Sequence, residues 1–169
     1  MFDSNDLLEK APRRRFERIL LARCRAGEPF ALMLVNLDGF KDVSKRFGAN
    51  VTDLLLFEVG SRLREKLNPR DLVTRSGDHQ FAVFVQGVDE MERANQIAQE
   101  LIERLQSPVT VTGTRFRLDA SIGISLAPKQ SGEWRLLLDD TDRAAHEAKT
   151  EGRGRISITF AAPKLTTDD

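Results

Sequence analysis

Cysteine is almost absent from this 169-residue chain, which contains only Cys24. An internal disulfide needs two cysteines, so the disulfide-rich class of small secreted domains is excluded. Cys24 stands at helical spacing from Phe16 and Leu20, and a small thiol on an apolar helix face is expected to be buried and structural rather than reactive. These features favour a reducing cytoplasm as the location of the domain.

An excess of charge of one sign is also missing, because 26 basic side chains balance 26 acidic ones. Broad affinity for nucleic acid or for an acidic membrane therefore has no support in the composition. The longest strictly apolar run, residues 30–35, is far too short to cross a bilayer, and the N-terminus lacks a basic region followed by an apolar stretch. We therefore expect that this domain does not insert into a membrane. A larger parent protein that is attached to a membrane remains compatible with the sequence.

Several common motifs are missing as well. No Cys/His spacing suggests a zinc site. The chain contains neither a GxxxxGK[ST] loop nor a GxGxxG turn, which argues against the common nucleotide-binding folds that these motifs mark.

The composition that is present is that of one globular domain, with 40% hydrophobic and 31% charged residues. We expect this domain to occupy residues 1–160. Residues 161–169 contain a proline and no hydrophobic periodicity, so they are expected to form a C-terminal linker or tail.

Hydrophobic periodicity predicts an α/β fold, with a central mixed β-sheet flanked by helices. Residues 30–38 are expected to form the central strand, buried on both faces and closing on polar residues at a functional edge. Asp53 is expected in the first turn of a helix. The expected helices are 12–27, 50–67, 89–106 and 134–152, and the expected strands are 30–38, a hairpin over 75–84, two strands about Gly113 within 109–127, and 155–160.

Four ordered segments resemble the GGDEF domain, the diguanylate cyclase family that condenses two GTP molecules into cyclic di-GMP. They read DLLEKAPRRRF, NLDGFKDVSKRFGANVTDLLL, LDASIGISLAP and TDRAAHEAKTEGRGR. The resemblance covers about residues 5–160 and implies the GGDEF, nucleotidyl-cyclase-like fold.

The signature hairpin of that family has changed residues in this chain. Gly77, Asp78, His79, Gln80 and Phe81 stand where the family reads Gly-Gly-Asp/Glu-Glu-Phe. The resemblance implies that working relatives bind two Mg²⁺ ions through carboxylates at the positions of His79 and Asn36. Mg²⁺ prefers anionic oxygen, which imidazole and amide groups do not supply. The signature is therefore interpreted as degenerate, with no catalytic residue and no metal site. A softer metal held by His79 with Asp38 or Asp78 is the alternative.

The resemblance also implies nucleotide contacts. The corresponding positions are Lys41, Lys149 and Arg153 for phosphate and Asp53 with Ser44 for the base. The alternative is structural: a basic helix end for Lys149 and Arg153, and a favourable place in the first turn of a helix for Asp53.

The inhibitory RxxD motif of the family corresponds to residues 68–71, where Asn68 replaces the arginine and Asp71 remains. An arginine fork at this place would bind a guanine or a phosphate, and an asparagine lacks it. We therefore expect a degenerate inhibitory site without cyclic di-GMP feedback.

These inferences predict a catalytically inactive, regulatory GGDEF domain in bacterial cyclic di-GMP signalling, with weak GTP binding. Resemblance to GGDEF domains joined to an EAL phosphodiesterase implies such a neighbour in a larger protein, and homodimerisation stays open. No tightly bound cofactor is expected, and Mg²⁺ is expected only if GTP binding survives. The alternatives are an active diguanylate cyclase and an interaction scaffold that binds no nucleotide.

Overall fold

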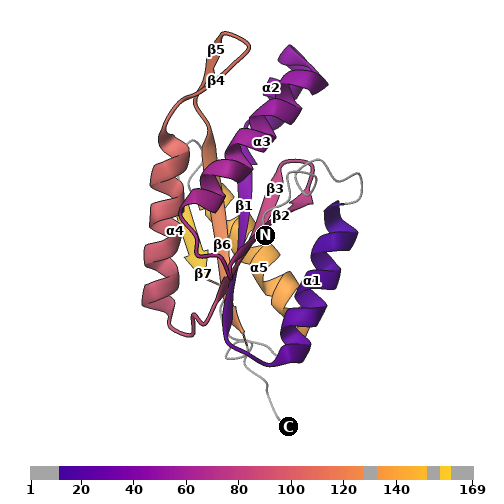
Figure 1. The fold of residues 1–169 in the computed structure, drawn as a ribbon, viewed down its shortest axis with the longest axis vertical. Helices are drawn as coiled ribbons and strands as arrows, with labels where there is room; N and C mark the ends of the chain where they lie inside the picture. The colour runs from indigo at the N-terminus through magenta and orange to yellow at the C-terminus, as the bar shows by residue number, and fades with distance from the viewer. Residues whose placement is uncertain (1–11, 128–132, 152–156, 161–169) are drawn as a thin grey trace.

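The structure is a computed structural model that describes residues 12–127, 133–151 and 157–160 (Figure 1). Helices and strands alternate along most of the chain. In order they are α1 (Pro12–Ala26), β1 (Phe30–Asp38), α2 (Phe40–Phe47), α3 (Ala49–Glu65), β2 (Leu72–Gly77), β3 (Gln80–Gln86), α4 (Met91–Gln106), β4 (Val109–Val111), β5 (Thr114–Phe116), β6 (Asp119–Ala127), α5 (Trp134–Glu151) and β7 (Ser157–Phe160).

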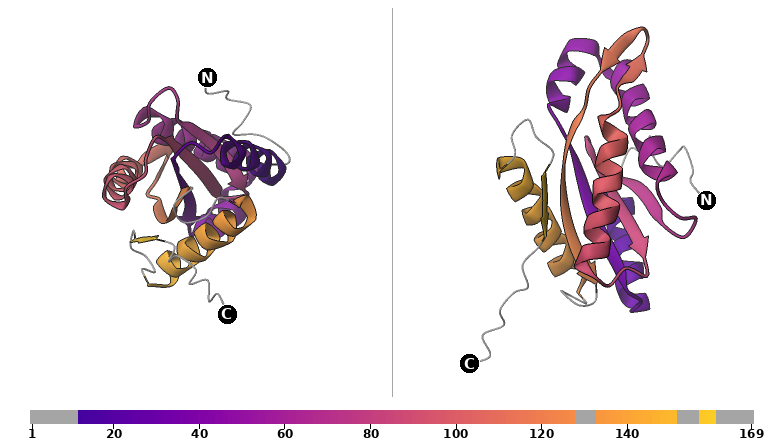
Figure 2. Two further views of the ribbon diagram at one scale, coloured as in Figure 1. Left: turned by 90° about the horizontal axis from the view of Figure 1, so that it is seen from below. Right: turned by 90° about the vertical axis from the view of Figure 1, so that its left-hand side faces the viewer.

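Five strands form one mixed sheet in the order β2-β3-β1-β6-β7. All neighbours are antiparallel except β6 and β7, which run parallel. Helices α3 and α4 contribute to the hydrophobic cluster on one face of the sheet, and α1 and α5 contribute to the cluster on the other (Figure 2). The predicted fold class, a central mixed sheet flanked by helices, is confirmed.

Strand β1 lies in the middle of the sheet, as its apolar sequence predicts. Its side chains alternate between the two clusters: Met33 and Val35 face α3 and α4, whereas Leu32 and Leu34 face α1 and α5. All four are fully buried. Because β1 pairs with β3 on one side and β6 on the other, its polar carboxyl end lies between two further strand ends.

A short helix that the periodicity did not predict follows β1 directly. Gly39, at φ 70°, turns the chain into α2, and Gly48, at φ 82°, separates α2 from α3. Both conformations favour glycine. Helix α3 consequently starts at Ala49, so Asp53 lies beyond its first turn, and the expectation of Asp53 in that turn is wrong.

Residues 109–127 form three strands rather than the expected two. Thr112 and Gly113, both with positive φ, close a tight hairpin between β4 and β5, which make a separate two-stranded sheet. The nine-residue strand β6 then enters the main sheet beside β1. The expectation failed because one alternating pattern runs through the hairpin and β6 without a break.

Cys24 is half-buried and is the only cysteine, and burial raises the pKa of its thiol. Cys24 is thus less buried than expected, although the raised pKa opposes formation of the reactive thiolate. Residues 161–169 lie outside the described part, so their role as a linker stays a prediction. Within the described residues, no helix is both long enough and apolar enough to cross a membrane.

Candidate functional site

Sheet register brings the polar end of β1 to the signature hairpin. Asn36 lies opposite Gln80 on β3 and opposite Ser121 on β6. Strand β2 ends at Gly77 and β3 begins at Gln80, so the tight turn consists of Asp78 and His79. Residues 36 and 76–80 therefore meet at one edge of the sheet, as the resemblance implies.

A chain of neutral side chains occupies this edge. The Gln80 amide Nε2 donates a hydrogen bond of 2.8 Å to Asn36 Oδ1, and Ser76 Oγ donates one of 2.8 Å to Gln80 Oε1. The polar groups of Asn36 and Gln80 thus bind each other. The sequence singled out Asn36 and Gln80 separately and did not predict this contact, because it depends on the register between two strands.

Asp38 is the acid at the end of β1. Its Oδ2 accepts a hydrogen bond of 3.0 Å from Ser121 Oγ, while its Oδ1 is buried without a hydrogen-bond partner among the described residues. Burial raises the pKa of the Asp38 carboxyl, and the charge of Asp119 acts in the same direction, against the Ser121 hydrogen bond and the charges of Lys149 and His79. Asp38 is therefore a half-buried carboxylate with a second acid, Asp119, opposite it on β6.

His79 lies against the start of α2. Its imidazole stacks on the Phe40 ring at 6.4 Å between centroids and 23° between planes. Burial lowers the pKa of His79, as do the positive charges of Lys149 and Lys41, and the charge of Asp78 opposes the shift. The lowered pKa favours the neutral imidazole, which carries no negative charge of the kind that a carboxylate offers to a cation.

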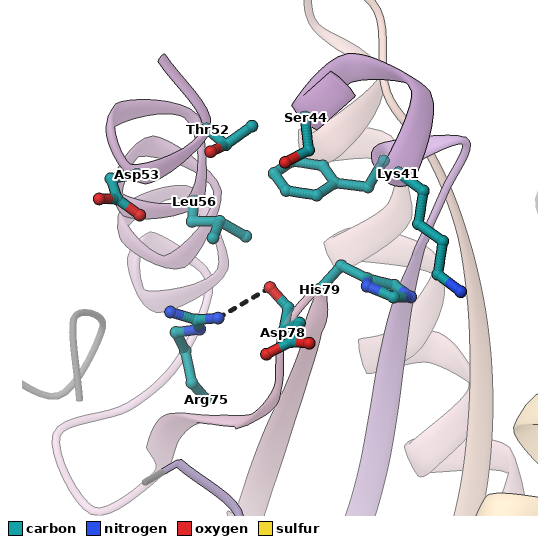
Figure 3. Close-up of a pocket in the computed structure, with 9 residues that line it drawn as sticks. Lys41, Ser44, Thr52, Asp53, Leu56, Arg75, Asp78 and His79 are labelled. Atoms are coloured by element: carbon teal, nitrogen blue, oxygen red, sulfur yellow. Dashed lines mark hydrogen bonds between the residues drawn. The ribbon is translucent and has the colours of Figure 1, made fainter. Parts of the chain in front are cut away.

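A pocket of about 270 Å³ opens beside the hairpin, between α2 and α3 (Figure 3). Its lining residues are Phe40, Lys41, Ser44, Thr52, Asp53, Leu56, Arg75, Asp78 and His79. Figure 3 shows Lys41 and His79 on one side of the pocket and Asp53 on the other. Three of the predicted nucleotide contacts, Lys41, Ser44 and Asp53, therefore share one cavity.

The two other predicted phosphate contacts come from the end of α5 and beyond. Lys149 is exposed in the last turn of α5, and its charge acts on both His79 and Asp38, which places it near the Lys41 side of the pocket. Arg153 lies outside the described residues. Of the predicted phosphate contacts, Lys41 lines the pocket, and Lys149 lies near it without lining it.

Arg75 is a pocket residue that the sequence did not single out. Its Nη2 donates a hydrogen bond of 3.1 Å to the backbone carbonyl of Gly77 and one of 2.7 Å to that of Asp78. Figure 3 shows the second of these. Burial lowers the pKa of Arg75, and the charges of Asp78 and Asp53 oppose this shift. The guanidinium holds the hairpin turn from inside. The sequence contains a signal for this burial: Arg75 lies two residues after Val73 in the same strand, so both side chains lie on the same, buried face of the sheet.

The predicted inhibitory-site residues line a second pocket. Asn68 and Asp71, together with Pro69, Arg70, Gln86 and Gly87, surround about 440 Å³. Asp71 is buried, and its two oxygens accept hydrogen bonds from the backbone N–H groups of Asn68, at 2.9 Å, and Gln86, at 3.0 Å. Its carboxylate therefore ties the loop before β2 to the end of β3.

The donors at the sheet edge fit Mg²⁺ poorly. Within residues 12–127, 133–151 and 157–160, no group of three or more His, Cys, Asp or Glu side chains is placed to hold a metal ion. Mg²⁺ requires anionic oxygen in near-octahedral geometry. Near Asn36, the neutral amide of Gln80 and the imidazole of His79 stand beside the carboxylate of Asp38, whose cross-strand partner is Asp119.

Comparison with known proteins adds independent findings. A family model described as "Diguanylate cyclase, GGDEF domain" matches residues 11–155. The bifunctional diguanylate cyclase/cyclic di-GMP phosphodiesterase MucR of Pseudomonas aeruginosa is 32% identical over 154 residues, which are 88% of this chain and 22% of MucR. Diguanylate cyclase TpbB of the same species is 31% identical over 156 residues, 89% of this chain and 36% of TpbB. The chain thus spans only a minor part of these relatives.

Solved structures share the fold. The crystal structure of the GGDEF domain of TpbB matches with a TM-score of 0.79 and 30% identity, over 87% of this chain and 94% of that one. An EAL/GGDEF domain protein from M. capsulatus matches with a TM-score of 0.76 and 26% identity, over 90% of this chain and 100% of that one.

Proposed function

Because the chain belongs to the GGDEF domain family, we propose that it is a regulatory domain of a cyclic di-GMP signalling protein that does not itself condense GTP. The observation that carries this proposal is the 2.8 Å hydrogen bond between the amides of Gln80 and Asn36. Family resemblance implies acids at these two positions. Two amides satisfy each other without a cation, whereas two acids at this distance need a cation or a shared proton between them.

The energetic consequence follows from Coulomb's law. A carboxylate and a unit positive charge about 4 Å apart attract each other by about 4 kcal/mol at an effective dielectric constant near 20. The resemblance places the two metal ligands at the positions of Asn36 and His79. Loss of half that attraction at each position removes about 4 kcal/mol of transition-state stabilisation, which is about a thousandfold in rate. We therefore infer that metal-assisted phosphoryl transfer does not proceed at a useful rate in this domain.

Weak GTP binding is the second part of the proposal. Lys41 and Lys149 supply positive charge for phosphates, and Asp53 supplies an acceptor for the N–H groups of guanine. Asp78 adds a negative charge to the same pocket, and Ser44 offers only one hydroxyl. GTP is therefore expected to bind less tightly than it would to an acidic, metal-loaded site, and its affinity is expected to depend little on Mg²⁺.

The architecture of the parent protein belongs to the proposal as well. MucR carries the name of a cyclase and a phosphodiesterase together, and the M. capsulatus neighbour is an EAL/GGDEF protein. Both support an EAL phosphodiesterase as a neighbour in the same chain. In that arrangement the GGDEF domain would sense GTP or position the neighbour, and no diguanylate cyclase step would be needed.

Calorimetric titration with GTP, with and without Mg²⁺, tests the binding part. We expect weak heat of binding that Mg²⁺ does not strengthen. Stronger binding with Mg²⁺ would contradict the proposal. The absence of any binding, together with no rise in melting temperature in excess GTP, would favour a scaffold that recognises protein alone.

An active diguanylate cyclase is the competing function, and the name of TpbB, a diguanylate cyclase, favours it. Steady formation of cyclic di-GMP from GTP with Mg²⁺ or Mn²⁺ would establish the active enzyme and end the proposal of inactivity.

A further inference from the structure

Helices α1 and α4 carry unpaired charge of opposite sign on opposite sides of the molecule. The whole chain is neutral, yet α1 holds six arginines and one glutamate. The exposed face of α4 carries Glu92, Glu100 and Glu103, together with one arginine, Arg93, which hydrogen-bonds to Gln96. The two helices lie at opposite edges of the fold in both Figure 1 and the left view of Figure 2. The neutral composition thus conceals a separation of charge.

The basic surface is one stripe along α1. Arg14, Arg18 and Arg25 are exposed, and their spacing of four and seven residues places them on one face of the helix. Two other arginines are occupied, since Arg13 pairs with Glu17 and Asp142, and Arg23 hydrogen-bonds to Gln86. Among the described residues, the three arginines of the stripe form no ion pair. We call these three residues the arginine stripe.

The acidic surface has matching dimensions. Glu92, Gln96, Gln99 and Glu103 are exposed on α4 at spacings of four, three and four residues, with Glu100 beside them. Within the part of the chain that the structure describes, none of the three glutamates forms an ion pair. They are called the glutamate stripe below. The outermost members of each stripe are 11 residues apart, which is about 16 Å along a helix.

Two such helices lying antiparallel would bring all three charges of each stripe into register. Arg14 would face Glu103, Arg18 would face Glu100, and Arg25 would face Glu92. Antiparallel helix dipoles also attract each other. We propose that the arginine stripe of one copy of this chain binds the glutamate stripe of a second copy.

Local features of α1 suit the glutamate stripe of a second copy. A shallow hollow of about 270 Å³ lies between Arg15 and Arg18, above Ile19 and Ala22, and can receive the aliphatic part of a glutamate or glutamine side chain. The positive groups of the stripe are all arginines, whose planar forks bind carboxylates through two hydrogen bonds. The partner surface should therefore be rich in carboxylates and of modest size, as α4 is.

A lipid surface fits less well. The exposed large hydrophobic residues of the described chain are Leu54, Phe57, Met91 and Leu136, and none of them is on α1. Without an apolar anchor, a few arginines give only marginal attraction to anionic lipid. The matching charges on α4 favour a second copy.

The arrangement is heterologous, because the two surfaces of one contact are different. Each copy keeps a free arginine stripe or a free glutamate stripe after pairing with one neighbour. Copies should therefore add head to tail and give a mass that grows with concentration, rather than stopping at a closed dimer. This association uses neither the pocket of Figure 3 nor its ligand.

Salt sensitivity is the direct expectation, since exposed charges are screened over about 10 Å at 0.1 M salt and about 3 Å at 1 M. Sedimentation velocity of the 169-residue chain should show association at about 0.05 M sodium chloride that is lost at about 1 M. A monomer at both salt concentrations would overturn the proposal, including a monomer that binds vesicles containing phosphatidylserine.

A charge-swap experiment tests the pairing itself. One variant carries Arg14→Glu, Arg18→Glu and Arg25→Glu, and the other carries Glu92→Arg, Glu100→Arg and Glu103→Arg. Each variant alone should be monomeric, because its two stripes have the same sign, whereas an equimolar mixture should associate again. Circular dichroism verifies that both variants are folded.

The matched control reverses two exposed arginines outside both stripes, Arg115→Glu and Arg117→Glu, and should associate like the unmodified chain. Association that persists in either stripe variant alone, or a mixture that stays monomeric while both variants are folded, would overturn the proposal.

Discussion

Single residues at the edge of the sheet determine the chemistry of this site. Asn36, Gln80 and Ser76 form a neutral hydrogen-bonded chain in which each contact is 2.8 Å. A polar chain of this kind is stable because its members satisfy one another. A change at the middle residue should therefore affect both neighbours.

Gln80→Ala is expected to lower the free energy of unfolding by about 1–2 kcal/mol, because half-buried Asn36 Oδ1 and buried Ser76 Oγ lose their partner. Urea unfolding measures the change. Gln99→Ala, at an exposed position of α4, is the matched control and should change stability by less than about 0.5 kcal/mol. Equal effects of the two substitutions would show that the chain of amides adds nothing to stability.

His79 should make the fold sensitive to acid. Burial and the charges of Lys149 and Lys41 lower its pKa in the folded state. At pH values between this lowered pKa and the ordinary histidine pKa, the unfolded chain binds more protons than the folded chain. The free energy of unfolding therefore falls as the pH decreases through this range. Unfolding free energies measured between about pH 7.5 and about pH 5 should fall less steeply for His79→Gln than for the unmodified chain. Identical slopes would contradict this account of His79.

Lys149→Ala should weaken GTP binding by about tenfold if this lysine contacts phosphate, which corresponds to about 1.4 kcal/mol. Calorimetry measures the affinity. Lys45→Ala is the control, because Lys45 is an exposed lysine of α2 whose charge, unlike that of Lys149, is not among those that shift the pKa of His79 or Asp38. If both variants bind GTP as the unmodified chain does, Lys149 is an ordinary surface charge at a helix end.

At the scale of elements, the close contact between β6 and α5 determines how near the helix lies to the sheet. A Cβ atom added at Gly123 would lie 2.3 Å from Ala145 N and 2.5 Å from Thr141 O, both in the backbone of α5. Only glycine permits this approach, and α5 carries Lys149 beside the candidate site.

Gly123→Ala is therefore expected to lower the free energy of unfolding by about 3 kcal/mol, because the helix must move away from the sheet. Gly77→Ala is the matched control, since its added Cβ would meet only Gln80 Cβ at 3.5 Å and its φ is not positive. Thermal or urea unfolding measures both. A mild effect at Gly123, equal to that at Gly77, would show that α5 adjusts freely.

The elements that the sequence predicts best are those with a long apolar pattern. The apolar stripe of residues along α4 and the continuous apolar run of β1 both predicted the correct element at the correct position. Helix α2 escaped prediction because it has eight residues and buries only Phe40. The turn at Gly113 was predicted, but the break between β5 and β6 escaped because the alternating pattern continues through Arg117 and Leu118. Short elements depend on neighbours that periodicity does not describe.

At the scale of the whole molecule, the site assembles where β1, the signature hairpin and the starts of α2 and α3 converge. Lys41, Ser44 and Asp53 could be predicted as one group through family resemblance, and the structure places all three around one pocket. The Asn36–Gln80 contact could not be predicted, because it depends on how two strands far apart in the sequence pair. The hydrogen bonds of Arg75 to Gly77 and Asp78 are local and depend on the conformation of the hairpin turn. The separation of charge between α1 and α4 likewise appears only in three dimensions.

The central claim is that this domain does not make cyclic di-GMP, and turnover measures it directly. The chain would be incubated with GTP and Mg²⁺ or Mn²⁺, and cyclic di-GMP would be quantified beside a variant that carries Asn36→Asp, Asp78→Gly, His79→Asp and Gln80→Glu. The account predicts no product from the unmodified chain and measurable product from a folded variant. Steady formation of cyclic di-GMP by the unmodified chain would contradict it.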